Sequence, residues 1–211
     1  GAFGSTGQRC TATSRVIVES GVRGAFEEAL LQEAASVVVG DGLAEGTTMG
    51  PCVDGGRQAD VLRHIEQARA DGAELLLGGS PVTEGALAHG FYVAPTIFTG
   101  VTPAMRLFRE EVFGPVLAIT EASNFEHAVA LANDCDFGLS SAIFTRDLTR
   151  ALRFTRESEA GMVHVNLTTT YSEPHLPFGG YKDSGFGGRE AGWEAIEFFT
   201  EWKTVYLEGL S

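Results

Sequence analysis

Hydrophobic positions along the chain alternate between two spacings, and this alternation predicts strands and helices in turn. Short runs rich in β-branched residues, such as residues 14–19, are typical of buried strands. Segments in which apolar residues recur every three or four positions, such as residues 22–35, are typical of amphipathic helices. The predicted strands are 14–19, 37–40, 74–77, 91–98, 116–120, 140–145, 161–165 and 203–207, and the predicted helices are 22–35, 56–71, 124–133, 147–157 and 190–199.

The order of these elements predicts the fold class. Strands separated by helices of about ten residues require crossover connections, which are typical of parallel sheets. We therefore expect an α/β fold with a largely parallel, twisted sheet and helices on both faces, and an edge or irregular position for residues 91–98, which contain Pro95. Active sites of such sheets lie outside the carboxyl ends of the strands, which directs attention to Asn166 and the loop after it.

Composition narrows the function classes. The chain has 211 residues, of which 44% are hydrophobic, so it can bury a sizeable core. A net charge of −13 argues against a nucleic-acid partner, and no apolar run approaches a membrane span. The three cysteines are sparse, no cysteine or histidine cluster has metal-ligand spacing, and the first residues lack signal-peptide character. We expect a cytoplasmic protein with no metal site and no membrane partner.

Cys10 is the first candidate for chemistry. It follows Gly7-Gln8-Arg9 in a segment of small residues and glycines, where the backbone is tight and apolar cover is sparse. Such a thiol is either a reactive nucleophile or a small hydrophobe packed in the protein, and local composition leaves both readings open.

Two further segments carry candidate residues. Glu110 and Glu111 precede an aromatic, a glycine and a proline. This pattern fits either a solvated acidic loop or a turn in which one acid accepts hydrogen bonds from ligand hydroxyls while Phe113 stacks beneath a flat ring of the ligand. Residues 167–188 form a long loop without periodicity, which is usually functional in a compact domain. Because this loop holds His175, a thiol hydrolase that pairs Cys10 with His175 is one hypothesis. The glycine-rich segments do not fit a phosphate-binding loop.

Taken together, these motifs resemble those of a known family. The segment Phe3-Gly4-Ser5-Thr6-Gly7-Gln8-Arg9-Cys10 resembles the cysteine signature of the NAD(P)-dependent aldehyde dehydrogenase superfamily. Glu111-Val112-Phe113-Gly114-Pro115 is similar to its second hallmark, and Asn166 with Pro177-Phe178-Gly179-Gly180 is similar to its third. Supporting matches are Met49-Gly50-Pro51, Gly78-Gly79, Ala94-Pro95-Thr96, Ala132-Asn133, Phe137-Gly138-Leu139-Ser140 and Lys203-Thr204-Val205.

The resemblance implies a role for each matching residue. Cys10 would attack the aldehyde to give a thiohemiacetal and then a thioester, with its own backbone N–H as an oxyanion donor. Glu111 would bind the nicotinamide ribose of NAD or NADP, and Phe113 would pack near the nicotinamide ring. Asn166 would support the cysteine loop. The residues that would shape the aldehyde tunnel, and so bind substrate, are Tyr171, His175 and Phe178.

The resemblance also implies what this chain lacks. Residues 1–200 correspond to the catalytic domain and residues 201–211 to a C-terminal strand used in homo-oligomer contacts. The N-terminal cofactor-binding domain and the glutamate that activates the deacylating water belong to a part of the family that this sequence does not include, so we expect no turnover by the 211-residue chain alone. Arg9 and the loop 168–175 resemble members that act on carboxylate-bearing semialdehydes, such as 2-oxoglutarate semialdehyde. A CoA-acylating member and a non-enzymatic assembly protein remain the alternatives.

Overall fold

The computed structural model describes residues 1–209. Its strands are β1 (Arg15–Glu19), β2 (Glu74–Leu77), β3 (Thr96–Thr99), β4 (Val116–Ala122), β5 (Phe137–Gly138), β6 (Ser140–Ile143), β7 (Met162–Val165) and β8 (Tyr181–Lys182). Its α-helices are α1 (Arg23–Ala34), α2 (Gly55–Ala70), α3 (Arg106–Arg109), α4 (Phe125–Asn133), α5 (Leu148–Glu157) and α6 (Gly192–Phe199). Short 3₁₀ turns are η1 (Gly4–Gly7), η2 (Ser20–Val22) and η3 (Gly85–His89).

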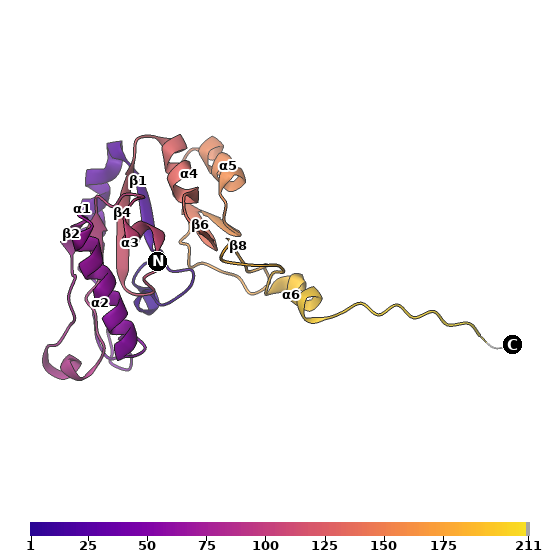
Figure 1. Cartoon of the computed structure of the whole chain (residues 1–211), viewed down its shortest axis with the longest axis horizontal. Coiled ribbons are helices and arrows are strands. Elements are labelled where there is room, and N and C mark those ends of the chain that lie inside the picture. The colour runs from indigo at the N-terminus through magenta and orange to yellow at the C-terminus, as the bar shows by residue number, and fades with distance from the viewer. Residues whose placement is uncertain (210–211) are drawn as a thin grey trace.

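The main sheet has four strands in the order β1-β4-β3-β2. β1, β4 and β3 are parallel, and β2 joins β3 in the antiparallel direction. β6 and β7 form a separate parallel pair, and β5 and β8 form a short antiparallel pair. The expected α/β class with a largely parallel sheet is therefore confirmed, although the parallel strands fall into two groups (Figure 1).

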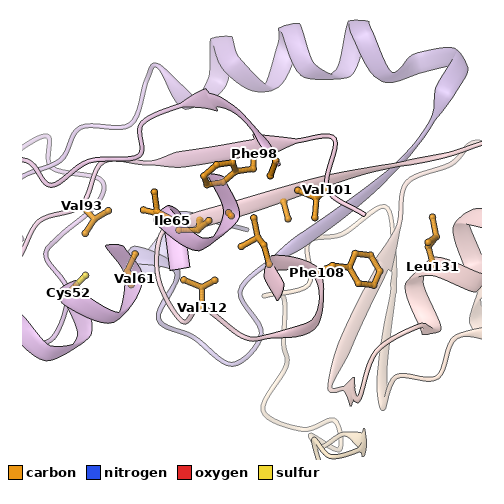
Figure 2. Packing of buried hydrophobic residues seen from close by; sticks show 14 of the residues in the cluster. Cys52, Val61, Ile65, Val93, Phe98, Val101, Phe108, Val112 and Leu131 are labelled. Carbon is orange, nitrogen blue, oxygen red and sulfur yellow. The ribbon is translucent and has the colours of Figure 1, made fainter. Parts of the chain in front are cut away.

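The alternation of side chains along β4 explains why helices cover both faces of the main sheet. Val116 and Ala118 point into a cluster with residues of α2 and α4, whereas Leu117 and Ile119 point into a second cluster with residues of α1. Figure 2 shows the first cluster, in which Val61 and Ile65 of α2 lie beside strand residues such as Phe98. β4 is buried on both faces, as a central parallel strand should be.

Helix starts follow the sequence signals closely. The side chain of Asn124 accepts a hydrogen bond from the backbone N–H of His127 at the start of α4, which confirms the predicted cap. Asp54 and Asp147 cap α2 and α5 in the same way. These caps fix the ends of the three helices that pack on or beside the sheets.

Three predicted strands differ from the structure. Residues 37–40 form only a single bridge, between Val39 and Met49, because the short valine run pairs with a loop rather than with a strand of the sheet. The strand predicted over 91–98 begins only at Thr96, after Pro95. It lies inside the sheet rather than at an edge, although its pairing with β2 is irregular, with a register shift between Leu75 and Leu77. Its proline causes no loss of pairing because it precedes the first ladder residue.

The predicted closing strand over residues 203–207 is not formed. Within the described residues this segment has no strand to pair with, and its side chains are exposed, with Tyr206 at 91% and Leu207 at 92% of full accessibility. It extends away from the rest of the chain after α6 (Figure 1). An extended segment without a partner satisfies its backbone groups with water and not with a ladder. Residues 210 and 211 of the predicted C-terminal unit lie outside the described residues.

Two searches of the described residues bear on partners and metals. No helix in residues 1–209 has the length and apolar character needed to cross a membrane. In the same residues no group of three or more histidine, cysteine, aspartate or glutamate side chains could hold a metal ion.

Candidate active site

Cys10 lies at the tip of a tight loop. Ser5, Thr6 and Gly7 all have positive φ angles, of 51°, 58° and 64°, and the backbone N–H of Ala12 closes a turn by donating to the carbonyl of Arg9 at 2.9 Å. This geometry leaves the Cys10 side chain exposed, whereas Cys52 and Cys135 are buried. The reading of Cys10 as a packed hydrophobe is therefore wrong, and the thiol is open to a small molecule.

The cysteine loop rests on the loop that carries Glu111. Gly7 packs so closely against Gly114 that a Cβ atom at Gly7 would lie 2.1 Å from the Gly114 carbonyl oxygen. On its other side, the Thr6 hydroxyl donates to the carbonyl of Gly50 at 3.0 Å. The first and second sequence motifs, about a hundred residues apart in sequence, therefore lie in direct contact.

The packing of Val112 decides where its two neighbours point. Val112 is only 4% exposed and belongs to the core cluster around α2. Glu111 and Phe113, on either side of it, line the same cavity of about 1030 Å³ as Cys10. Phe113 has a φ of 53°, a left-handed conformation that turns the chain sharply ahead of Gly114. The buried valine thus anchors an acid and an aromatic ring that line the same cavity as the thiol.

Glu111 is electrostatically distinct from its neighbour Glu110. Desolvation by surrounding protein raises the pKa of Glu111, although its side chain reaches solvent and the charge of Arg57 opposes the shift. Hydrogen bonding to Arg106 lowers the pKa of Glu110 instead. Among residues 1–209, no donor forms a hydrogen bond or ion pair with the Glu111 carboxylate. A partly desolvated acceptor without a donor fits a ligand that brings hydroxyl groups.

Arg57 is a site residue that the sequence patterns did not reveal. It lies in the first turn of α2, and its guanidinium carbon lies 5.9 Å from the centre of the Phe113 ring. Nothing in the local sequence distinguishes it from the other arginines of this polar helix face. Only the folded contact shows that it supplies positive charge to both Phe113 and Glu111.

Thr169 joins the long loop to the cysteine loop. Its hydroxyl donates to the carbonyl of Thr11 at 2.7 Å and lies 2.8 Å from the hydroxyl of Thr13, while its own carbonyl accepts from Ser140 at 2.8 Å. Thr169 also lines the cavity that contains Cys10. The long loop after β7 is therefore held against the cysteine loop by threonine contacts, and not by Asn166 or Phe178 of the third family motif.

Asn166 makes different contacts from those expected. Its side-chain oxygen accepts from the backbone N–H of Thr145 at 2.9 Å, and its amide nitrogen donates to the Thr145 carbonyl at 3.0 Å. It therefore ties the ends of β6 and β7 together, and within residues 1–209 its side chain forms no hydrogen bond with the cysteine loop. Its role in substrate binding stays a prediction.

The other three tunnel candidates lie outside the wall of the Cys10 cavity. Tyr171 donates its hydroxyl to Glu173 at 2.5 Å, which raises the pKa of the tyrosine. Phe178 is held by two backbone hydrogen bonds to Glu190, of 2.6 and 2.7 Å, and His175 is exposed. The structure groups these residues on one loop but does not bring them to the thiol, so their tunnel roles also stay predictions.

The geometry counts against the Cys10–His175 hydrolase. That hypothesis requires the thiol within hydrogen-bond reach of the imidazole, and no such bond exists in the part of the chain that the structure describes. The nearby Arg9 is exposed and forms no ion pair within residues 1–209; its one hydrogen bond is a 3.5 Å contact with the Thr170 carbonyl. Arg9 therefore has no acidic partner among the described residues.

The site lies at the amino ends of the strands. Cys10 precedes the start of β1, and Glu111 precedes the start of its parallel neighbour β4, so both loops emerge from the same edge of the sheet. The expectation that the carboxyl ends would carry the chemistry is wrong for these two motifs. That rule assumes catalytic loops that follow strands, whereas here a left-handed turn and a buried valine present the side chains before the strands begin.

An exposed thiol on a tight turn, in a cavity that a partly desolvated acid and an aromatic ring also line, is typical of a cysteine-dependent enzyme site on an α/β scaffold. Comparison with known proteins identifies the family: residues 1–205 match the model of the aldehyde dehydrogenase family, and the chain belongs to it.

Similar sequences and solved structures support the same family assignment. The chain is 45% identical over 208 residues to the alpha-ketoglutaric semialdehyde dehydrogenase of Bacillus subtilis, covering 99% of this chain and 43% of that protein. It is 47% identical to the alpha-ketoglutarate semialdehyde dehydrogenase of Haloferax volcanii, covering 98% and 42%. The crystal structure of an NAD-dependent aldehyde dehydrogenase from Sinorhizobium meliloti superposes with a TM-score of 0.92 at 39% identity, covering 98% of this chain and 40% of that one. The chain thus spans about two fifths of the length of these relatives.

Proposed function

We propose that this chain is the catalytic-domain portion of an NAD(P)-dependent aldehyde dehydrogenase that converts an aldehyde to a carboxylate through a thioester on Cys10. The observation that carries the proposal is the exposed Cys10 thiol in a cavity that Glu111 and Phe113 also line. Family membership and the names of the relatives support the reaction class.

The residues of this chain fit the first half of such a reaction. The Cys10 thiolate would form a carbon–sulfur bond with the aldehyde carbon, which places negative charge on the former carbonyl oxygen. The backbone N–H of Cys10 donates to no acceptor within residues 1–209, so it is free to stabilise that oxyanion. The product of this step is a thiohemiacetal.

Glu111 and Phe113 fit a nicotinamide cofactor. The Glu111 carboxylate would accept hydrogen bonds from ribose hydroxyls, and the Phe113 ring would pack beside a flat ring. When bound, NAD or NADP supplies the acceptor for the hydride that leaves the thiohemiacetal carbon. Cys10 then holds the acyl group as a thioester, and attack by water would release the carboxylate and regenerate the thiol.

We propose a carboxylate-bearing semialdehyde as the substrate, of the kind named for the two relatives. Arg9, next to the nucleophile and without an acidic partner in the described residues, would pair with the substrate carboxylate. Arg9→Gln should therefore raise KM for a carboxylate-bearing semialdehyde by about tenfold or more, the loss of one exposed charge-assisted contact. An uncharged aldehyde of similar length should be affected much less, and equal effects on both would contradict the assignment.

We further propose that residues 201–209 form an oligomerisation strand in the whole protein and that the protein is cytoplasmic. The exposed apolar side chains of Trp202, Val205, Tyr206 and Leu207 support the first statement, since such a segment gains most from a partner's cover. Three free cysteines support a reducing compartment.

The decisive test uses the protein extended upstream by its encoded sequence. Reduction of NAD and NADP would be followed with a panel of semialdehydes, with and without coenzyme A. Cys10→Ser should abolish reduction, and Cys135→Ser, a matched change at a buried cysteine, should retain it. Activity that survives Cys10→Ser would disprove the mechanism, and an acyl-CoA product would assign the acylating reaction. Steady turnover by the 211-residue chain would disprove the expectation that it is inactive alone.

A further inference from the structure

His164 is a buried histidine that the proposed reaction does not use. It lies in β7, next to Val163, which packs on Phe125 and Val129 of α4 and on Phe154 of α5. Because side chains alternate along a strand, His164 points to the opposite face of the β6–β7 pair. There its ring meets the loop that follows β7 and carries Thr169 to the cysteine loop.

Both ring nitrogens of His164 face carbonyl oxygens. Nε2 lies 2.9 Å from the Tyr171 carbonyl in the loop, and Nδ1 lies 3.0 Å from the Ser141 carbonyl in β6. A carbonyl oxygen only accepts hydrogen bonds, so each contact requires an N–H on the ring. The neutral imidazole has one N–H and the imidazolium has two. Only the imidazolium can therefore donate to both carbonyls.

Loss of the second proton costs the loop a hydrogen bond in either tautomer. If Nδ1 keeps its proton, Nε2 presents a lone pair to the Tyr171 carbonyl, and that bond is lost. If Nε2 keeps its proton, the Nδ1 lone pair faces the Ser141 carbonyl, and the donor within reach is the Ser140 hydroxyl, 3.4 Å from Nδ1. That hydroxyl donates to the Thr169 carbonyl at 2.8 Å, so turning it to Nδ1 releases Thr169.

The loop is held by three consecutive carbonyl groups. The carbonyls of Thr169, Thr170 and Tyr171 accept from Ser140, Arg9 and His164, respectively. Arg9 is the residue proposed above to pair with the substrate carboxylate. Thr169 lines the cavity that contains Cys10, and its hydroxyl donates to the carbonyl of Thr11, the residue after the cysteine. A shift of the loop would therefore move a wall of this cavity and the support of Arg9 together.

No carboxylate forms an ion pair with His164 in residues 1–209, and the ionisable groups around it have other contacts. On the loop side, the Tyr171 hydroxyl is bound to Glu173, and Arg9 contacts the loop backbone. β6, at residues 140–143, contributes no ionisable side chain. α5 packs on the opposite face of the pair, so its charged side chains do not face the ring. These side chains are Arg150, Arg153, Arg156 and Glu157.

We propose that His164 is a positioning residue whose imidazolium form holds residues 168–171 against the cysteine loop, so that loss of its second proton loosens the cavity wall near Cys10. Among the described residues, His164 does not line the cavity, so it acts through Thr169 and Arg9 and not on the reacting atoms. Its effect on aldehyde binding rests on the proposed function, whereas the contacts of its ring do not.

Hydrogen exchange tests these contacts without any readout of catalysis. The protein extended upstream by its encoded sequence would be compared at about pH 6 and about pH 8, which bracket the range in which an imidazole ordinarily loses its second proton. Protection of the amides in residues 168–172, corrected for the intrinsic effect of pH on exchange, should fall by about five- to tenfold at the higher pH, as expected for one lost hydrogen bond. β4 is the internal control, and its protection should not change in this way.

Variants assign this change to His164. His164→Gln should show the lower protection at both pH values, and His164→Phe repeats the test with an apolar ring. His89→Gln is the matched control, because His89 is an exposed histidine of η3, and this variant should behave like the unaltered protein. Protection that does not change with pH in the unaltered protein, or a fall that persists in both His164 variants, would overturn the proposal.

Steady-state kinetics of the extended protein tests the consequence for catalysis. Between about pH 6 and about pH 8, KM for a carboxylate-bearing semialdehyde should rise about fivefold more in the unaltered protein than in His164→Gln. The pH profile of kcat should be the same in both, because the thiol is unaltered. An equal rise of KM in both proteins would overturn the proposal. Failure of the extended protein to reduce NAD or NADP would instead refute the proposed function, and the exchange experiment would still decide the role of His164.

Discussion

The contact between Gly7 and Gly114 holds two parts of the site together, and Gly7→Ala tests it. A methyl group at Gly7 would lie 2.1 Å from the Gly114 carbonyl oxygen and 2.5 Å from its carbon, and Gly7 also has a φ of 64°. Both atoms belong to backbone, so they cannot move aside by changing rotamer. One of the two loops must shift instead.

The expected magnitude follows from two costs and one gain. A left-handed conformation costs an alanine about 1–2 kcal/mol, and overpacking of a close contact costs about 1–3 kcal/mol. The reduced freedom of the unfolded chain returns about 0.4–1 kcal/mol. We therefore expect Gly7→Ala to lower the free energy of unfolding by about 2–4 kcal/mol.

Urea unfolding followed by circular dichroism measures this loss. Gly4→Ala is the matched control, because Gly4 lies in the same turn, has no atom within 4 Å of an added Cβ and lacks a positive φ. It should change the unfolding free energy by no more than about 0.5 kcal/mol, as surface substitutions do. If Gly7→Ala were as mild as Gly4→Ala, the contact between the two loops would not exist as described.

Three further predictions concern the thiol, the acid pair and the long loop. A thiol reagent such as iodoacetamide should modify one cysteine rapidly in the folded chain and none in Cys10→Ser, because Cys52 and Cys135 are only 2% and 8% exposed; rapid reaction of a second thiol in the folded chain would contradict this. Hydrogen bonding to Arg106 lowers the pKa of Glu110. The Glu110 carboxylate therefore stabilises the fold above its ordinary pKa of 4.5, and this stabilisation is lost as the pH falls through the lowered pKa. Glu110→Gln should lower Tm at pH 7 and not at low pH. Desolvation raises the pKa of Glu111, so the charge of this carboxylate disfavours the fold above the raised pKa. Glu111→Gln should therefore raise Tm at pH 7, and the difference in Tm should vanish below pH 4.5. If Glu110→Gln and Glu111→Gln changed Tm in the same direction at pH 7, the assignment would be refuted. The two ring nitrogens of His164 lie 3.0 Å from the Ser141 carbonyl and 2.9 Å from the Tyr171 carbonyl. His164→Phe should therefore lower the free energy of unfolding by about 2 kcal/mol and speed hydrogen exchange in residues 168–172. Unchanged exchange in these residues would show that the imidazole does not hold the loop.

Local signals in the sequence were enough to predict most of the helices and strands. The Asn124 cap and the apolar spacing after it predicted α4 to within one residue, and the run Glu74–Leu77 predicted β2 with its observed bounds. These elements are set by interactions between near neighbours. The prediction of a strand over 203–207 was wrong because a strand forms only when another strand pairs with it. A local sequence pattern does not show whether such a partner is present.

The candidate site was predictable in its parts but not in its arrangement. Cys10 and Glu111 were found by sequence motif, and in the structure both line one cavity. Arg57 and Thr169 could not be found in this way, because an arginine on a polar helix face and a threonine in a loop carry no distinctive pattern. Their importance comes from contacts between segments far apart in sequence, such as Arg57 with Phe113 and Thr169 with Thr11.

The contacts of the cysteine loop separate the reactivity of the thiol from turnover of an aldehyde. Gly7 packs against Gly114, and the Thr6 hydroxyl donates to the Gly50 carbonyl, so residues of this chain hold the loop that carries Cys10. The 211-residue chain should therefore keep a reactive thiol even though we expect it not to turn over aldehyde. Alkylation of Cys10 in the 211-residue chain, together with turnover only in the protein extended upstream, is the combination that these contacts predict. Loss of alkylation in the 211-residue chain would instead mean that the described contacts do not hold the cysteine loop.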